Sequence, residues 1–505
     1  MLGACVLTAL CSFAPAASQS LAQTSSSVAG LLNDGLSHPP PATGPFAYDN
    51  FVPALSVGAS YTDPVFGSTV KRVTTDGAFD NLYARNMWWN ADETRYWHYG
   101  KVMNLVTNTV EYSGMPNGDT SNTGFDPVDP NVYYYFSGSS IHKVTLQGGG
   151  TWTDTVYFTA PGGATIKDLG GTLNWFDASG RYMLVRYGAE PSVYIYDRQN
   201  MAAGPYANPV SGAVTADSNG YVGLSPDGQY IIGYEDVGGV YGMGQGVSWK
   251  INHTTRSVAA SPTIFWSLCG DHGAFISASD GRNYMIVFNC HNFDEIWRVD
   301  ITNNANGLTE DQQKALPNNQ RLLGPLDWSV TGHLTTVAKG PFADWAFFTT
   351  EDSNDGFNGG VSSWFPYRQE VIGLNVMTGE VRRLAHHRSR SLGANYFYQP
   401  RVSVSWSGKF VGWASNFNQS GVANIYAVPF AGPSSPDTTP PTVSMIAPSN
   451  GATVSGTAVT VSANASDNVG VVGVQFKLDG ANLGAEVTAA PYSFSWNTTL
   501  ASTGA

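Results

Sequence analysis

The chain repeats one pattern of polar and apolar positions seven times between Asn90 and Asn416. A turn rich in Ser, Asp and Gly is followed by a polar or basic residue and then by aromatic and β-branched residues. Gly and Asp suit a tight turn, and alternating large residues suit a half-buried strand, so each repeat predicts a β-hairpin. The repeats are NADETRYWHYG (90–100), DPNVYYYF (129–136), DASGRYMLV (177–185), SPDGQYIIGY (225–234), SASDGRNYMIVF (277–288), GPFADWAFFT (340–349) and SWSGKFVGWAS (405–415).

The spacing of the hairpins predicts how they are arranged. Steps of roughly forty to sixty residues match a blade of four strands, and repetition at that period is typical of a β-propeller. We therefore predict an all-β fold with a seven-bladed β-propeller over residues 61–432. The strand expected at 68–74 (STVKRVT) would complete the last blade and close the ring, which leaves no exposed sheet edge.

The segments around the propeller have simpler patterns. Residues 1–23 combine an apolar run with small-residue cleavage options, which predicts a signal peptide and hence a protein that is secreted, periplasmic or at the cell surface. Residues 24–60 form a low-complexity lead-in rich in Ser, Pro and Ala, and residues 433–441 (PSSPDTTPP) are a linker by composition. The remaining residues, 442–505, alternate strictly and turn often.

Composition and charge narrow the classes of partner. Aromatic residues at 12%, charged residues at 12% and 56 glycines fit an all-β protein better than one with long amphipathic helices. The net charge of −13 argues against nucleic acid and against anionic membrane surfaces as partners. No stretch beyond the signal is apolar enough for membrane insertion, and the sequence leaves the oligomeric state open.

Two of the four cysteines remain after the predicted signal is removed. Cys269 and Cys290 flank the fifth hairpin, and folding the strands about its turn brings them within a residue or two of facing each other. In an oxidising compartment this arrangement predicts a disulfide. Metal binding is the weaker alternative, although His272 and His291 lie beside the two cysteines.

The hairpins also sort polar residues by face. In a propeller blade the innermost strand begins, and the second strand ends, on one face, which we call the loop face; the turns lie on the opposite, hairpin face. Residues flanking the hairpins should therefore converge on the loop face, around the central channel. The turn residues Asp92, Asp227, Asp280 and Lys409 point the other way, and we interpret them as structural.

Six of the nine histidines fall on the loop face: His98, His272, His291, His333, His386 and His387. Loops ordinarily carry polar residues, so any one of these histidines is more simply explained as structural. Their convergence from several blades favours a site. The long loop 353–370, which carries Trp364 and Tyr367, offers aromatic platforms suited to sugar rings, or equally a plug packed over the channel mouth.

Two resemblances follow from these motifs. The segment with PPTVSMIAPSNGATVSG, VQFKLDG and PYSFSW resembles bacterial Ig-like modules, which implies an incomplete Ig-like β-sandwich over residues 442–505. SPDGQYIIGY, with DASGRYMLV and SWSGKFVGWAS, resembles the TolB-like propeller repeat. The second resemblance implies the propeller architecture and leaves the activity open.

The stretch 384–416 resembles the last blade of oligogalacturonate-lyase-like propellers. Its layout is a His pair, a Tyr followed by Gln-Pro, a strand and the turn Ser-x-Ser-Gly-Lys. In that family a Gln and several histidines hold a divalent metal ion, and the resemblance implies Gln399, His386 and His387 as ligands here. The sequence departs from the family directly after Gln399, where Pro400, Arg401 and Val402 stand in place of the expected histidines.

These residues suit eliminative cleavage of a uronate-containing glycan. Such a reaction needs a group that neutralises the carboxylate, which Arg does well, and a base for the neighbouring C–H, which His can supply. A non-catalytic propeller that binds glycan or protein, carried on Ig-like spacers, is the alternative. The predicted catalytic residues are His272, His291, His333 and Arg401. The predicted substrate-binding residues are Arg85, Asn86, Trp364, Tyr367, Arg388, Arg390, Tyr396 and Asn416.

Overall fold

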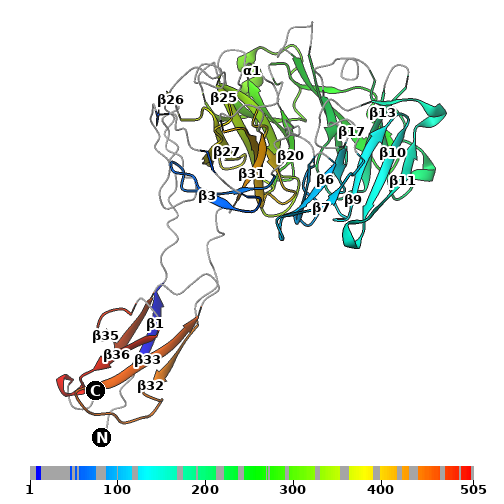
Figure 1. Ribbon diagram of the computed structural model, residues 1–505. Helices are drawn as coiled ribbons and strands as arrows, with labels where there is room; N and C mark the ends of the chain where they lie inside the picture. The colour runs from blue at the N-terminus through cyan, green and yellow to red at the C-terminus, as the bar shows by residue number, and fades with distance from the viewer. Residues whose placement is uncertain are drawn as a thin grey trace. The chain divides into compact units, whose positions relative to one another are not determined.

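Antiparallel hairpins follow one another along the computed structural model (Figure 1). The structure describes residues 7–12, 46–47, 52–53, 56–74, 87–98, 100–116, 123–167, 175–188, 192–211, 221–236, 244–268, 270, 273–289, 295–324, 330–352, 363–364, 366–390, 399–417, 423–430, 442–466, 473–487 and 491–501. The chain divides into two compact units, which are Gln23–Gly432 and Met1–Ala22 together with Pro433–Ala505. Each unit is described by itself.

Within the described residues of Gln23–Gly432, seven sheets of three to five strands follow one another. The first sheet contains β5 (Arg95–His98), β6 (Lys101–Asn104) and β7 (Thr109–Ser113). The second contains β8 (Thr123–Phe125), β9 (Val132–Ser137), β10 (Ser140–Leu146) and β11 (Trp152–Thr159). The third contains β12 (Ile166–Lys167), β13 (Tyr182–Tyr187) and β14 (Ser192–Asp197). The fourth contains β15 (Tyr221–Leu224), β16 (Tyr230–Asp236), β17 (Gly244–Asn252), β18 (Ser257–Val258) and β19 (Thr263–Trp266). The fifth contains β20 (Ala274–Ser277), β21 (Asn283–Asn289), β22 (Glu295–Asp300) and β23 (Gln320–Leu323).

Of the last two sheets, the seventh also contains strands from the N-terminal part of this unit. The sixth contains β24 (Val330–Thr336), β25 (Trp345–Asp352), β27 (Glu370–Asn375) and β28 (Val381–His386). The seventh contains β29 (Ser403–Val404), β30 (Phe410–Ser415), β31 (Asn424–Pro429), β4 (Thr69–Arg72) and β3 (Ser60–Thr62). Strand β4 pairs with β31 through Tyr426 and Ala427, so the prediction that residues 68–74 complete the last blade is confirmed.

Short elements complete the described secondary structure. A two-stranded pair joins β2 (Phe46–Ala47) to β26 (Ser363–Trp364). The helix α1 (Glu310–Lys314) begins at Thr309, whose side chain forms a capping box with Gln312. The single 3-10 turns are η2 (Gly148–Gly150), η3 (Pro161–Gly163), η4 (Met201–Ala203) and η7 (Thr498–Leu500). No helix in the described part of the chain is long and apolar enough to cross a bilayer.

In five of the sheets the predicted hairpin joins the first and second strands, and in the first and third sheets it joins the second strand of the blade to an inner segment that forms a single bridge, Trp89 with Tyr96 and Phe176 with Met183. Four of the hairpins share a cap, in which a polar side chain at the end of the inner strand accepts the backbone N–H five residues later. The four pairs are Asn90 with Arg95, Asp177 with Tyr182, Ser225 with Tyr230 and Ser405 with Phe410, at 2.7–3.0 Å. This cap explains why the turns read Asn, Asp or Ser followed at a fixed distance by an aromatic residue or Arg.

The hairpins also link the sheets to one another. Each sheet is hydrogen-bonded to the next one through turn residues on the hairpin face, and the seventh is bonded to the first. The links are Asn90–Pro130, Arg198–Asp126, Ala178–Pro226, Asn283–Asp227, Ser279–Asp344, Lys339–Trp406 and Ser407–Glu93, at 2.7–3.2 Å. A closed ring of sheets built this way is a β-propeller. The predictions of an all-β fold and of a propeller are confirmed.

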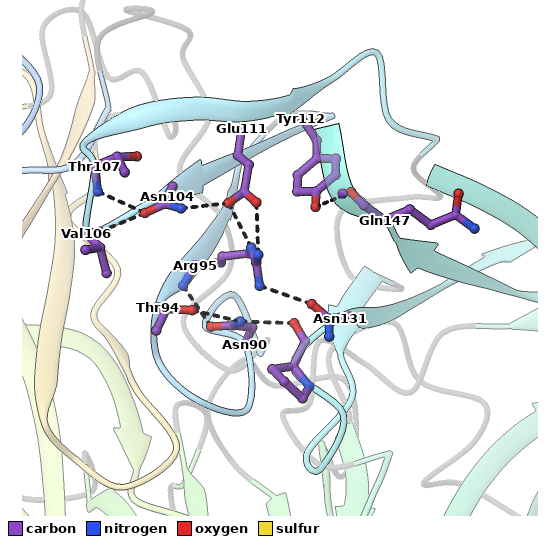
Figure 2. A network of polar contacts seen from close by, with 12 residues as sticks. Asn90, Thr94, Arg95, Asn104, Val106, Thr107, Glu111, Tyr112, Asn131 and Gln147 are labelled. Atoms are coloured by element: carbon purple, nitrogen blue, oxygen red, sulfur yellow. Dashed lines mark hydrogen bonds and ion pairs between the residues drawn. The ribbon is translucent and has the colours of Figure 1, made fainter. Parts of the chain in front are cut away.

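The first of these links lies within a larger polar network between the first two sheets (Figure 2). Arg95 donates to both carboxylate oxygens of Glu111 at 2.9 Å and to the Asn131 side chain at 3.2 Å. Asn104 donates to Glu111 at 2.8 Å and accepts two backbone N–H groups with its oxygen. The hydrogen bonds from Arg95 lower the pKa of the Glu111 carboxyl below its usual value. These polar groups join β5, β6 and β7 to one another and β5 to the second sheet.

The second unit is a small β-sandwich. One sheet contains β32 (Thr442–Ala447), β33 (Val459–Ser466) and β36 (Tyr492–Trp496). The other contains β34 (Gly473–Leu478), β35 (Ala481–Asn482) and β1 (Leu7–Ser12), and β1 comes from the segment predicted as a signal peptide. The buried side chains of Val461, Ala463, Val474 and Phe476 form its core.

Candidate functional site

The loop face is described only in part. Arg85, Asn86, His272, His291, Tyr396 and both cysteines, Cys269 and Cys290, lie outside the described residues. Trp364 is described only in its backbone, which pairs with Phe46. The predictions that rest on these residues stay predictions. The remaining members of the predicted site are described, and most of them separate into two groups, one at the inner strands and one at the outermost strand of the sixth sheet.

The inner group comes from the sixth and seventh sheets. His333 lies on the innermost strand β24, directly opposite Thr349 of β25, and its side chain is 2% exposed. Gly332 precedes it at a point of close strand approach, since a Cβ there would lie 1.8 Å from the Thr349 carbonyl oxygen. Strand β24 also contacts β29, the innermost strand of the next sheet. The residues that lead into β29 are therefore neighbours of the strand that carries His333.

Gln399 and Arg401 are those leading residues. The Pro400 carbonyl accepts the Ala414 N–H at 2.9 Å, so the pairing of the inner strand with β30 extends back to this point. Arg401 is buried and Gln399 is half-buried. The side-chain oxygen of Gln399 is buried and has no hydrogen-bond partner within the described residues. His333, Gln399 and Arg401 thus occupy the inner ends of two adjacent blades.

The outer group corrects the predicted metal site. His386 is the last residue of β28, the outermost strand of the sixth sheet, and is not part of the last blade or of the channel rim. Nδ1 of His387 accepts the Ser389 N–H at 3.0 Å, so Nε2 must carry the proton that it donates to the Thr350 carbonyl at 2.8 Å. Both nitrogens of His387 are used, which leaves no lone pair for a metal ion.

A metal site formed by Gln399, His386 and His387 therefore does not fit the described geometry. The outermost strand of one blade and the innermost strand of the next carry the three residues, and His387 is fully hydrogen-bonded. Within the described ranges, no three His, Cys, Asp or Glu residues are grouped in a way that could hold a metal ion. We derive no step of the chemistry through a metal at these residues.

Arg388 is also structural and not a substrate-binding residue. Its Nη1 donates to Asp63 Oδ2 at 2.6 Å, and the two side chains are 2% and 0% exposed. Asp63 in turn accepts the N–H groups of Val65 and Phe66 in the turn between β3 and β4. Because Asp63 already neutralises the guanidinium, Arg388 binds the N-terminal hairpin instead of a ligand.

Tyr367 does not form an exposed platform for a sugar. It is 1% exposed and belongs to an apolar cluster that includes Ile372 and Leu374. Its ring lies 5.3 Å from the guanidinium carbon of Arg383, which Phe66 covers at 5.4 Å. The described part of this loop therefore favours the packing alternative over the sugar platform.

Asn416 and Arg390 are brought together, as predicted for neighbours on the loop face. The Asn416 side-chain oxygen accepts the Arg390 N–H at 2.9 Å, and its amide donates to the Arg390 carbonyl at 2.7 Å. Asn416 directly follows β30, the second strand of the last sheet, while Arg390 lies in the connection between β28 and β29. Asn416 therefore fixes the backbone that carries the Arg390 guanidinium, and it acts as a positioning residue.

His387 predicts a loss of stability in mild acid. Burial, opposed by the hydrogen bond to the Thr350 carbonyl and aided by the nearby charge of Arg388, lowers the pKa of its ring from 6.5 to about 3. The unfolded chain therefore binds a proton that the folded chain excludes between these two values. The free energy of unfolding should fall as the pH falls through this window, by up to about 1.4 kcal/mol per pH unit. Urea unfolding of the wild type and of His387→Gln, at several pH values within the window, measures this slope.

The variant serves as the control because Gln can donate and accept hydrogen bonds but does not titrate. We expect a smaller slope in His387→Gln than in the wild type. His386 is present in both proteins and contributes to the pH dependence of the unfolding free energy with the same sign, because burial and then Arg388 lower its pKa. Equal slopes in the two proteins would contradict the assignment of a neutral, buried His387.

Sequence reasoning placed His98 and Lys101 on the loop face without including them in the site. His98 ends β5 and is 1% exposed, and Lys101 begins β6 directly opposite it. The first repeat indicates this placement in the sequence, because its second strand ends in Trp-His-Tyr-Gly directly before a lysine.

Comparisons with known proteins gave one family match and several similar solved structures. Residues 441–505 match the family model of the bacterial Ig domain. The chain combines a β-propeller with a C-terminal bacterial Ig-like domain. No match was found among curated proteins. Solved structures similar to it include an oligogalacturonate lyase from Vibrio parahaemolyticus, at 13% identity and a TM-score of 0.46, covering 74% of this chain and 96% of that one.

Two further solved structures come from other functional classes. A TolB-type protein of Agrobacterium tumefaciens is 15% identical with a TM-score of 0.32, covering 62% of this chain and 90% of that one. A periplasmic gluconolactonase of Pseudomonas aeruginosa is 12% identical with a TM-score of 0.37, covering 70% and 96%. Likeness at this level carries no argument about activity. The chemistry has to be argued from the residues of this chain.

Proposed function

We propose that this chain is an exported β-propeller protein that acts on a uronate-containing polysaccharide by lyase-type β-elimination. The supporting observation is the inner group on the loop face, where Gln399 and Arg401 lead into the last innermost strand beside the strand that carries His333. The Gln399 side-chain oxygen, which is buried and has no partner among the residues that the structure describes, adds an acceptor for a sugar hydroxyl. The predicted signal peptide supports export, and extracellular glycan is the partner that this location offers.

The chemistry assigns one role to each side chain. The Arg401 guanidinium pairs with the uronate carboxylate, which makes the adjacent C5–H more acidic. His333 takes the C5 proton, the electrons of that bond form the C4–C5 double bond, and the C4–O bond breaks with its electron pair on the leaving sugar oxygen. The leaving oxygen takes a proton from water, and His333 returns the C5 proton to water, so the enzyme ends in its starting state. The products are an unsaturated uronate end and a new sugar hydroxyl.

The reaction is tested by incubating the protein with pectate, alginate, ulvan and glycosaminoglycans, with and without divalent metal. We expect a rise in ultraviolet absorbance from the unsaturated product with at least one polymer. His333→Gln and Arg401→Gln should each lower the rate by roughly 10²-fold or more. Lys409→Gln is the matched control, because Lys409 is an exposed cation on the hairpin face. Absence of product from every polymer would reject the lyase proposal.

A non-catalytic glycan-binding propeller is the second candidate. The observation that favours it is that Tyr367, His387 and Arg388, all predicted site residues, serve packing and ring closure instead. Binding of an acidic glycan without any turnover in the same assays would support this candidate. The Ig-like domain would then act as a spacer that carries the binding propeller.

A further inference from the structure

An exposed Asn-Gly pair lies in the connection between β22 and α1. Asn306 and Gly307 are the central residues of a turn that the Leu308 N–H closes by donating to the Ala305 carbonyl at 3.1 Å. Gly307 has φ +74°, the left-handed conformation that the third residue of a type II turn needs. Both central residues are exposed, and a Cβ on Gly307 would meet no atom within 4 Å. Solvent therefore reaches the Asn306 side chain and the Gly307 nitrogen.

The second unit repeats this turn between β32 and β33. The Ala452 N–H donates to the Ser449 carbonyl at 2.9 Å, and Asn450 and Gly451 stand at the centre of the turn. Gly451 has φ +80°, both central residues are exposed, and a Cβ on Gly451 would also meet no atom within 4 Å. The same local geometry thus occurs in both units.

The two groups that could react with each other make no hydrogen bond in the first of these turns. Within the described ranges, neither the Asn306 side chain nor the Gly307 N–H has a hydrogen-bond partner. Asparagines in other turns differ, because their side chains cap the backbone. The Asn375 side-chain oxygen, for example, accepts the N–H groups of Met377 and Thr378 at 3.0 and 2.9 Å. The Asn306 amide is therefore not held in place by such a cap.

Asn304, two residues earlier in the same connection, provides a direct comparison. It is exposed as well, but it precedes Ala305, which is fully buried and whose N–H donates to the Ile264 carbonyl at 2.8 Å. The Asn304 side-chain oxygen accepts the Asn306 N–H at 3.1 Å. The backbone nitrogen that follows Asn304 is thus shielded and hydrogen-bonded, whereas the one that follows Asn306 is open to solvent.

We propose that Asn306 is a site of spontaneous covalent modification in the folded protein, with Asn450 as its counterpart in the second unit. Base from solvent removes the Gly307 amide proton, and the nitrogen attacks Cγ of Asn306. The side-chain NH2 group takes up a proton and leaves as ammonia, which closes a five-membered imide. Water then opens the imide at either carbonyl and gives aspartate or isoaspartate, each with a new negative charge. Water is the co-reactant, and the reaction does not depend on the proposed action on glycan.

The isoaspartate product should change the structure next to α1. It lengthens the main chain by one carbon at position 306, inside the turn that Ala305 and Leu308 close. The Leu308 carbonyl accepts from Gln313 Nε2 at 3.0 Å, and Gln313 also forms two hydrogen bonds to Ser267, at 2.6 and 2.8 Å. Ser267 directly follows β19. We therefore expect the modification to loosen the contact between α1 and the end of β19.

Peptide mapping by mass spectrometry tests the proposal on the full chain at mildly alkaline pH in water labelled with heavy oxygen. One sample is folded and a second is unfolded in guanidinium chloride. We expect Asn306 in the folded protein to gain one labelled oxygen within tenfold of its rate in the unfolded chain, because Gly307 has no Cβ to hinder the attack. Asn304 in the same folded protein should react at least ten times more slowly than Asn306.

Two further measurements identify the route. The rate at Asn306 should fall in mild acid, because the Gly307 nitrogen has to lose a proton before it attacks. Asn306→Gln should abolish the reaction at this position, since the longer side chain would have to close a six-membered ring. In the second unit Asn450 should react faster than Asn497, because the Thr498 N–H that follows Asn497 donates to the Gly456 carbonyl at 3.0 Å.

Three results would overturn the proposal. An Asn306 that keeps its amide in the folded protein while the unfolded chain reacts would mean that the turn protects it. Equal rates at Asn304 and Asn306 in the folded protein would mean that the local hydrogen bonds do not select the site. Aspartate without any isoaspartate would mean direct hydrolysis instead of an imide. Hydrogen exchange at the Ser267 amide, compared before and after the reaction, measures the expected loosening at α1, and unchanged exchange would contradict it.

Discussion

Replacing Glu370 by alanine should lower the free energy of unfolding of the propeller by about 3–5 kcal/mol. Arg383 Nε donates to one oxygen of Glu370 at 2.6 Å and Nη2 donates to the other, and the two side chains are 1% and 0% exposed. Burial raises the pKa of Glu370, while Arg383 opposes that rise by stabilising the carboxylate. Without the carboxylate, a buried guanidinium between Phe66 and Tyr367 would lose its counter-charge. Urea unfolding followed by tryptophan fluorescence measures the loss.

The matched control removes both charges together. Glu370→Leu combined with Arg383→Met replaces the ion pair by apolar groups of similar volume, and such replacements are often neutral or stabilising. We therefore expect the double variant to be far closer to the wild type than Glu370→Ala is. A double variant as unstable as the single one would mean that packing around these side chains, and not the uncompensated charge, dominates the loss.

The sequence was sufficient to predict the hairpins because their determinants are local. The cap that joins Ser225 to the Tyr230 N–H spans five residues, and the same spacing recurs at Asp177 and Ser405. Polar turn residues and alternating apolar residues therefore carry the pattern within a single repeat. The interpretation of Asp227 as structural follows from the same local logic, and its side chain does accept from Asn283 of the next sheet.

Closure of the ring was predictable for a different reason, which is that a sheet edge has to be paired. The last blade showed only three strands in the sequence, and β4 supplies the fourth from the other end of this unit. The number of strands in the last blade and one apolar segment outside the other blades are enough to predict this pairing. Side-chain contacts play no part in the prediction.

The site was less predictable because its residues are defined by distant partners. His387 and Arg388 look like candidate ligands in the sequence, yet Thr350 and Asp63 engage them, and Asp63 is 325 residues from Arg388. No local pattern shows that a histidine will donate to a backbone carbonyl or that an arginine will be neutralised. Similarly, only twelve residues lie between His386 and Gln399 in the sequence. His386 nevertheless ends the outermost strand of the sixth sheet, whereas Gln399 leads into the innermost strand of the seventh.

Replacing Asp63 should destabilise the closure of the ring in particular. Arg388 and Asp63 form a buried pair, with 2.6 Å between Nη1 and Oδ2, so loss of the carboxylate should cost about 3–5 kcal/mol. Asp63 lies in the turn that presents β4 to β31, and Val73 beyond β4 donates to the Ile425 carbonyl at 2.8 Å. We therefore expect the substitution to raise the rate of amide hydrogen exchange more in β4 and its partner β31 than in sheets remote from the closure, such as the one that contains β20 to β23.

The variant Asp63→Asn distinguishes the contribution of the ion pair with Arg388 from that of the hydrogen bonds within the turn. The asparagine side-chain oxygen can still accept the N–H groups of Val65 and Phe66, as Asp63 does, but it carries no charge for Arg388. If the ion pair holds the strand in place, Asp63→Asn should approach Asp63→Ala in both unfolding free energy and exchange at β4. If the turn contacts dominate instead, Asp63→Asn should behave like the wild type. In that case Arg388 would no longer explain how the N-terminal hairpin is fastened to the sixth blade.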